Sequence, residues 1–78
     1  MFGSDSSADV LPSRLEGVGS PVHQLLLIAM GTPILDNCDL EPLAEAAASR
    51  NRTTFLLVVA PLRVEAGTGS PVNPIATF

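Results

Sequence analysis

One histidine, His23, and the carboxylate of Asp36, 13 positions later, are the side chains of this sequence best suited to joint chemistry. His23 is expected in the first turn of a helix and Asp36 in a turn before the next helix. Imidazole and carboxylate groups together bind divalent metal ions. One interpretation is therefore that both residues converge on a single metal. A catalytic metal usually has three protein ligands and an open position for water, so further ligands would have to come from elsewhere.

Each of these residues also has a plain structural interpretation. A histidine at the start of an apolar helix is more often a partly exposed or hydrogen-bonded structural residue than a ligand. Asp36 can close the turn in which it lies, while Asp39 can cap the helix that follows. Cys38, between them, is expected to be a small buried apolar residue, because no base lies near it in the sequence.

Two other kinds of site are not supported by the motifs. The chain has many serines, but no spacing links one of them to His23 as a nucleophile and its base. The glycine-rich run 67–70 has neither a lysine next to Ser70, as in a phosphate-binding loop, nor a third glycine three residues after Gly69 with a helix beyond, because Pro71 and Val72 follow it. The metal interpretation is therefore the main chemical hypothesis.

Composition indicates a small acidic protein with more apolar surface than it can hide. Of its 78 residues 46% are apolar and only 15% charged, whereas a chain this short buries a limited share of its surface. Some apolar surface is therefore expected to face a partner or further polypeptide. The net charge of −4 disfavours nucleic acid, because it repels phosphate groups.

The sequence also predicts where the protein resides. A single cysteine, Cys38, cannot form an internal disulfide, which favours a reducing, cytoplasmic setting. The first ten residues are polar and acidic and lack the pattern of a signal peptide. The apolar runs 25–30 and 55–62 are far shorter than the roughly 20 residues that cross a bilayer. We therefore expect no membrane association.

Two helices are predicted after a loop-rich lead-in over residues 1–19. The first spans about 21–30, because Ser20 can cap it, Pro21 suits its first position and Gly31 can end it. Its middle has no polar face, which predicts burial on most sides. The second helix spans about 40–50 and is rich in alanine.

A buried strand is predicted over about 53–64, which is dense in β-branched and apolar residues and includes the unbroken apolar run 55–59. Pro61 indicates that its pairing is interrupted or lies at a sheet edge. The tail 66–74 should form turns, and 75–78 can return to a strand. The sequence therefore predicts a mixed α+β class, with residues 1–78 forming a single partial domain.

Several motifs follow one another along the chain: Gly-Ser-Asp and Asp-Val-Leu-Pro in 3–12, Pro-Val-His-Gln-Leu-Leu at 21–26, Ile-Leu-Asp-Asn at 34–37, Leu-Glu-Pro-Leu at 40–43, Phe-Leu-Leu at 55–57, Ala-Pro-Leu at 60–62 and Gly-Thr-Gly-Ser-Pro-Val-Asn-Pro-Ile-Ala at 67–76. In this order, they resemble the C-terminal part of the cyclase family of metal-dependent hydrolases. The closing run is the most specific piece, and the resemblance covers nearly the whole chain.

This resemblance implies a compact β/β/α fold and hydrolysis of amide bonds through a metal-activated water, as in kynurenine formamidase (arylformamidase) and isatin hydrolase. The family's later metal-ligating His maps onto His23 and its later acid, usually Glu, onto Asp36, which is one methylene shorter. The divalent metal would be zinc or manganese, and the substrate a small-molecule amide. The family's N-terminal motif, His-x-Gly-Thr-His-x-Asp-x-Pro-x-His, does not occur in these 78 residues.

The resemblance leads to two hypotheses about the chain itself. As the C-terminal segment of a hydrolase, it would have no independent activity and would bind metal weakly at most. As a non-catalytic association module, it would complete a hydrolase fold with an N-terminal half or associate with its own copies, burying the helix at 25–30 and the strand at 55–59. A small α+β domain that shares only ancestry with the family is the third possibility.

Overall fold

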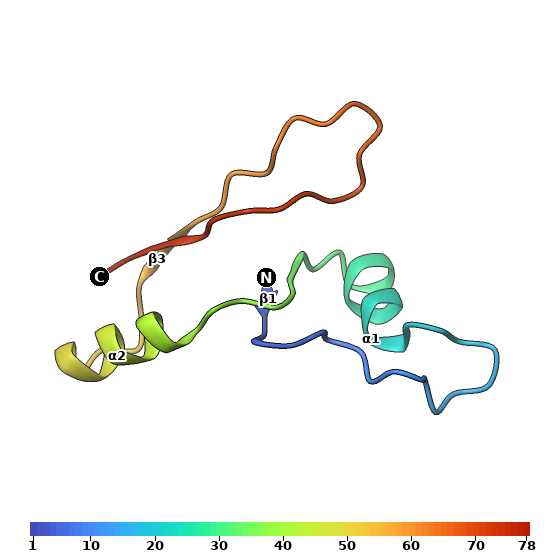
Figure 1. Ribbon diagram of the computed structural model, residues 1–78, viewed down its shortest axis with the longest axis horizontal. Coiled ribbons are helices and arrows are strands. Elements are labelled where there is room, and N and C mark those ends of the chain that lie inside the picture. Colours follow the sequence, from blue (N-terminus) through green and yellow to red (C-terminus); the bar gives the residue numbers. More distant parts are fainter. The chain divides into compact units, whose positions relative to one another are not determined.

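The computed structural model describes residues 1–78 and divides them into two compact units, Met1–Leu40 and Glu41–Phe78 (Figure 1). Each unit combines helix with a pair of very short strands. The predicted mixed α+β class is therefore confirmed. The more specific expectations, a β/β/α cyclase fold and a single partial domain, stay predictions.

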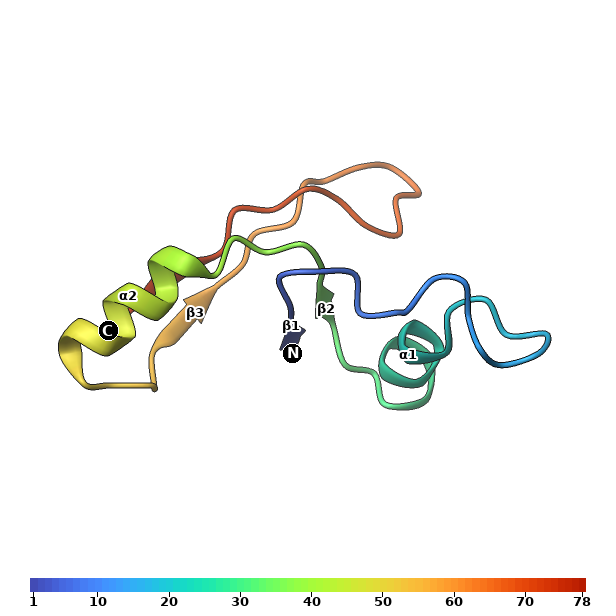
Figure 2. The ribbon, with the colours of Figure 1, turned by 60° about the horizontal axis from the view of Figure 1, so that its bottom comes forward.

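In the first unit, two strands hold the beginning of the chain against the segment that precedes Asp36. Strand β1 (Phe2–Gly3) pairs in parallel with β2 (Ile34–Leu35), and the two lie side by side in Figure 2. Backbone hydrogen bonds extend this pairing, from the Phe2 N–H to the Pro33 carbonyl at 2.9 Å and from the Ser4 N–H to the Leu35 carbonyl at 3.0 Å. Except for β1, the lead-in 1–19 forms no helix or strand, as predicted.

The helix predicted over 21–30 is present in two parts. Helix α1 (Pro21–His23) continues into a π-helical segment, η1 (Gln24–Ala29), whose wider turns bond each N–H to the carbonyl five residues back, as between Met30 and Leu25 at 3.0 Å. Gly31 follows with a φ of +61°, a left-handed conformation that glycine adopts without strain, and ends the helix. Both predicted boundaries are therefore confirmed.

The chain by itself does not provide the burial that the apolar middle of this helix predicts. Leu25 is 55% exposed and Ile28 80% exposed, and no residue of either helical part is buried. The cause is the absence of a layer to cover it, because β1 and β2 are two residues long and the lead-in lacks a regular element. An apolar helix is buried only where other elements supply a surface.

Helix α2 (Glu41–Arg50) opens the second unit and matches the predicted range of about 40–50. It begins after Leu40, so Asp39 is one position too early for the cap that the sequence predicts. At the other end Asn51 adopts a φ of +47°, and the Arg52 N–H returns to the Ala47 carbonyl at 3.0 Å. Asparagine in the left-handed conformation is a common end to a helix.

The strand predicted over 53–64 is much shorter and is not buried. Strand β3 (Leu56–Val58) pairs antiparallel with β4 (Ile75–Thr77), with Leu57 opposite Ala76. All three residues of β3 are exposed, Leu56 at 65%. With β4 as its one partner, β3 has no second layer against which to bury a face, and the pairing ends before Pro61, which has no N–H to donate. The predicted return to a strand near the C-terminus is confirmed by β4.

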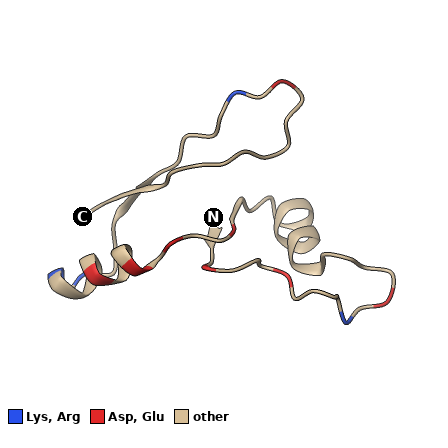
Figure 3. Cartoon of the chain, viewed as in Figure 1, with Lys and Arg blue, Asp and Glu red and all other residues tan.

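Neither unit has an apolar core. No apolar residue is buried, and fifteen large apolar side chains are exposed over both units. Acidic residues are spread along the chain, with basic residues few and scattered (Figure 3). No helix has both the length and the apolar character required to cross a membrane.

Candidate functional site

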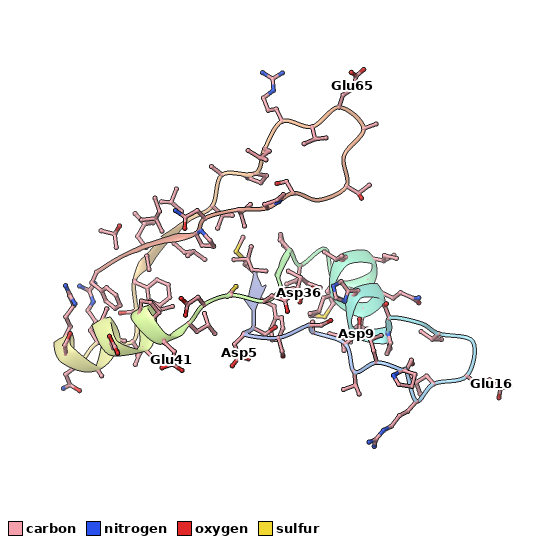
Figure 4. All side chains as sticks on the ribbon, in the orientation of Figure 1. Asp5, Asp9, Glu16, Asp36, Glu41 and Glu65 are labelled. Atoms are coloured by element: carbon pink, nitrogen blue, oxygen red, sulfur yellow. The ribbon has the colours of Figure 1, made fainter.

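Three side chains of the first unit meet at the start of α1, and His23 lies at their centre. Its ring nitrogen Nδ1 is 2.5 Å from Oδ2 of Asp9, and Nε2 is 2.8 Å from Oδ2 of Asp36. In Figure 4 the labelled side chains of Asp9 and Asp36 both lie beside α1. We call these three residues the Asp–His–Asp cluster. Its members come from the lead-in, the helix and the turn after β2.

The pairing of β1 with β2 positions Asp36. It follows β2 directly, and Asn37 turns the chain with a φ of +54°, so that the Cys38 N–H reaches back to the Ser4 carbonyl at 2.8 Å. The second carboxylate oxygen of Asp36 accepts the Ala8 N–H at 2.9 Å. Asp36 therefore holds the lead-in at the end of β2 by a hydrogen bond to Ala8, the residue before Asp9.

Asp9 performs the capping that the sequence assigns to Ser20. Its Oδ1 accepts the Val22 N–H at 2.7 Å and its Oδ2 the His23 N–H at 3.1 Å, whereas the Ser20 side chain makes no capping bond. A carboxylate at this end satisfies free N–H groups and interacts favourably with the helix dipole. Because Asp9 is only 6% exposed, it is also the single buried polar residue of the chain.

The contacts of His23 require protons on both ring nitrogens when both carboxylates are ionised. An ionised carboxylate only accepts hydrogen bonds, so Nδ1 must donate to Asp9 and Nε2 to Asp36. The ring is then an imidazolium between two carboxylates. Charge-assisted hydrogen bonds of this kind are short and strong.

The pKa values of two members follow from this arrangement. The hydrogen bond to Asp9, and then that to Asp36, raise the pKa of His23 above 6.5, although burial acts in the opposite direction. For Asp9, burial raises the pKa, but the hydrogen bonds from the Val22 N–H and from His23 outweigh it, so the pKa lies below 3.8. The cluster therefore favours the ion-paired state.

We predict that the first unit is most stable in mildly acidic solution. His23, with its pKa raised on folding, stabilises fully below 6.5 and loses this contribution as the pH rises through the folded-state value. Asp9, with its pKa lowered, stabilises fully above 3.8 and loses its contribution as the pH falls through the folded-state value. Helix content measured by circular dichroism should therefore be greatest between these two pH values. A His23→Gln variant should lack the decline on the alkaline side, and an unchanged decline would contradict this prediction.

The structure brings together both residues that the sequence predicts as metal ligands, His23 and Asp36. It adds Asp9 of the lead-in, which contacts the other ring nitrogen of His23. Sequence reasoning missed Asp9. The available sequence signal is that the first turn of α1 contains no acid, so a carboxylate at this helix start has to come from another segment. Cys38 and Asp39 take no part, and the Cys38 thiol donates to the Leu35 carbonyl at 3.4 Å.

The cluster fits the donor chemistry of one part of a metal site. A metal-ligating histidine almost always donates its other ring N–H to a carboxylate or carbonyl, and Asp9 provides that carboxylate. The ligands available from this chain would then be Nε2 of His23 and a carboxylate oxygen of Asp36. No group of three or more His, Cys, Asp or Glu side chains is arranged to hold a metal ion. The chain therefore offers two ligands, one fewer than catalytic sites usually have.

No family model, curated protein or solved structure matches the chain. The features that bear on its function are therefore its sequence motifs and the Asp–His–Asp cluster.

Proposed function

We propose that this chain is the C-terminal part of a cyclase-family metal-dependent hydrolase that acts on amide bonds, of the arylformamidase kind. The observation that supports the proposal is the convergence of His23 and Asp36, whose side chains meet at 2.8 Å from segments 13 positions apart. These are the two positions that the family resemblance marks as ligands. The shorter side chain of Asp36, where the family usually has Glu, still reaches the ring.

The roles of the residues follow from their contacts. His23 and Asp36 would supply an imidazole and a carboxylate ligand, and zinc and manganese both accept such ligands. A divalent metal, when bound, supplies an activated water and a polarised substrate carbonyl. The exposure of the His23 side chain, 30%, and of Asp36, 25%, leaves this edge of the cluster open to an ion or to further ligands.

The same proposal implies that the 78 residues do not hydrolyse amides alone. Two ligands leave a metal weakly held, and the remaining ligands would come from the N-terminal half of the family fold. The parent's substrate would be a small-molecule amide. A cytoplasmic location, which the single thiol of Cys38 favours, is part of the proposal.

A metal titration followed by NMR tests the proposal. Zinc, which is diamagnetic, added to the 78-residue chain should perturb the ring signals of His23 and the carboxylate signals of Asp36, while those of Asp39 stay unchanged. Asp39 is only three positions from Asp36 in the sequence, but it lies outside the Asp–His–Asp cluster, so its signals should not respond to the metal. Perturbation of Asp39 and Glu41 instead of His23 would contradict the proposal.

A second function, a non-catalytic association module, is favoured by one specific observation. No apolar residue is buried, and the two apolar surfaces that the module would bury, at 25–30 and 55–59, include Ile28 at 80% and Leu56 at 65% exposure. Contiguous exposed apolar surface is typical of interaction sites. The module would complete a hydrolase fold with another chain or pair with its own copies. Both functions can apply to one chain, since a partner could also complete the metal site.

A further inference from the structure

We propose that strand β3 is the surface through which two copies of this chain pair, edge to edge and antiparallel, about a two-fold axis at Leu57. This pairing rests on the association module proposed above, for which it names the partner and the register. It is independent of the metal hypothesis, whose residues His23 and Asp36 belong to the other unit.

One edge of β3 has no partner strand. The sheet consists of β3 and β4, so β4 occupies one side of β3 and the other side is free. Outside the pairing with β4, no backbone hydrogen bond involves residues 53–60. The N–H and carbonyl groups of the free edge can therefore bond to a further strand, which is a common way for one chain to add to the sheet of another.

The segment around β3 lacks the residues that usually protect a sheet edge. Proteins place charged side chains or proline there, which prevents pairing with another chain. Residues 53–60 include neither, and β3 is exposed, with Leu56 at 65% and Val58 at 49%. The free edge of β4 is less suitable, because Pro74 directly precedes this strand and has no N–H to donate.

The distribution of charge favours a second copy as the partner. Each copy has a net charge of −4, so two copies repel each other where their acidic residues meet. This disfavours the edges of β1 and β2, because Asp5 lies two residues after β1 and Asp36 directly follows β2. Residues 53–62 carry no charge. An identical strand therefore meets this edge without repulsion, and the two copies bury the same apolar groups on each other.

The flanking arginines favour the register centred on Leu57. With Leu57 opposite its own copy, all of β3 overlaps with the second β3, and Arg52 lies opposite Leu62. A slip by one residue in one direction would instead place Arg52 opposite Arg63. Like charges directly opposite each other destabilise an antiparallel pair. The centred register combines full overlap of the strand with separation of these charges.

Opposite charges at Leu57 test the pairing by sedimentation velocity. Leu57→Lys and Leu57→Glu each place like charges opposite each other in a pair of identical copies. Each variant alone should therefore associate about 10- to 100-fold more weakly than wild type. An equimolar mixture of the two should regain association, because a lysine then lies opposite a glutamate. Val64→Lys and Val64→Glu are the matched controls, since Val64 is 55% exposed and lies outside β3, and each should associate as wild type does.

Wild type provides a second test that does not depend on the folding of any variant. In a sample that mixes ¹³C-labelled with unlabelled copies, isotope-filtered NMR detects only contacts between copies. The centred register predicts contacts between Leu56 of one copy and Val58 of the other. An associated sample without these contacts overturns the proposal.

The outcomes separate this pairing from the association module. If Leu57→Lys associates as tightly as wild type, or if the mixture of Leu57 variants stays as weakly associated as its components, the pairing of β3 is overturned. Association that survives both Leu57 changes but is lost in Ile28→Glu also overturns it, while the module remains, with η1 as its surface. A wild type that stays monomeric at all concentrations excludes the pairing of copies and leaves the metal hypothesis untouched.

Discussion

Replacing Asp36 with Asn is expected to weaken zinc binding by the chain by more than the roughly 10- to 100-fold that follows loss of a carboxylate behind a ligand, because it removes one of the two ligands themselves. The amide oxygen of the Asp36→Asn variant can still accept the Ala8 N–H that Asp36 accepts at 2.9 Å, so the lead-in should stay attached to the end of β2. The amide NH₂ can also donate to Nε2 of His23, which would occupy the lone pair that a metal requires. The measurement is calorimetric titration of both proteins with zinc.

Asp39→Asn is the matched control for this change. It removes the same charge three positions away, from an exposed residue with no contact to His23. Its zinc affinity should equal that of wild type. If Asp36→Asn and Asp39→Asn reduce affinity equally, the effect is one of net charge, and ligation by Asp36 is refuted.

Replacing Ile28 with Glu is expected to weaken the self-association that the association module implies by about 10- to 100-fold or more. Ile28 is 80% exposed within its own unit, so the change should leave the contacts of α1 and η1 intact. Burying an isoleucine contributes roughly 1.5–3 kcal/mol. Introducing a charge at such a position should thus weaken an interface by about 10- to 100-fold or more. Sedimentation velocity over a range of concentrations measures this effect.

Gln24→Glu provides the control in the same helix, since it adds the same charge at an exposed polar position. It should associate as wild type does. A wild-type chain that stays monomeric at all concentrations, with stable helix content, would contradict pairing of the module with its own copies. The apolar helix would then be left for a different partner chain to cover.

The local signals of the sequence predicted the helices well, because helix ends depend on nearby residues. Pro21 begins the first helix and Gly31, with its φ of +61°, ends it. The second helix ends at Arg50, and Asn51 adopts the left-handed conformation that follows a helix. Such boundaries are decided by residues within one turn of the helix end.

Burial and strand length were predicted poorly, because both depend on partners that a local pattern does not specify. The apolar run near Phe55 indicates a strand buried on both faces, yet β3 pairs over three residues with β4 and remains exposed. Leu25 and Ile28 are also apolar and also exposed. Apolar periodicity indicates which residues can be buried and not what covers them.

The candidate site also contains residues that the sequence predicts and one that depends on a distant partner. His23 and Asp36 could be selected by residue type, position and family resemblance, and the structure places them in contact. Asp9 could not be selected in this way, because its bonds to the helix start join residues 13 and 14 positions apart with no motif between them. A helix start with a basic residue and no acid in its first turn is the signal to apply in similar sequences.

The central claim is that His23 and Asp36 bind a divalent metal, and calorimetric titration of the purified chain with zinc and manganese, alongside His23→Ala, tests it most directly. Saturable binding of either metal that disappears in His23→Ala is the expected result. Equal binding by both proteins, or binding by neither, would contradict the claim and leave the association module as the better description of the chain.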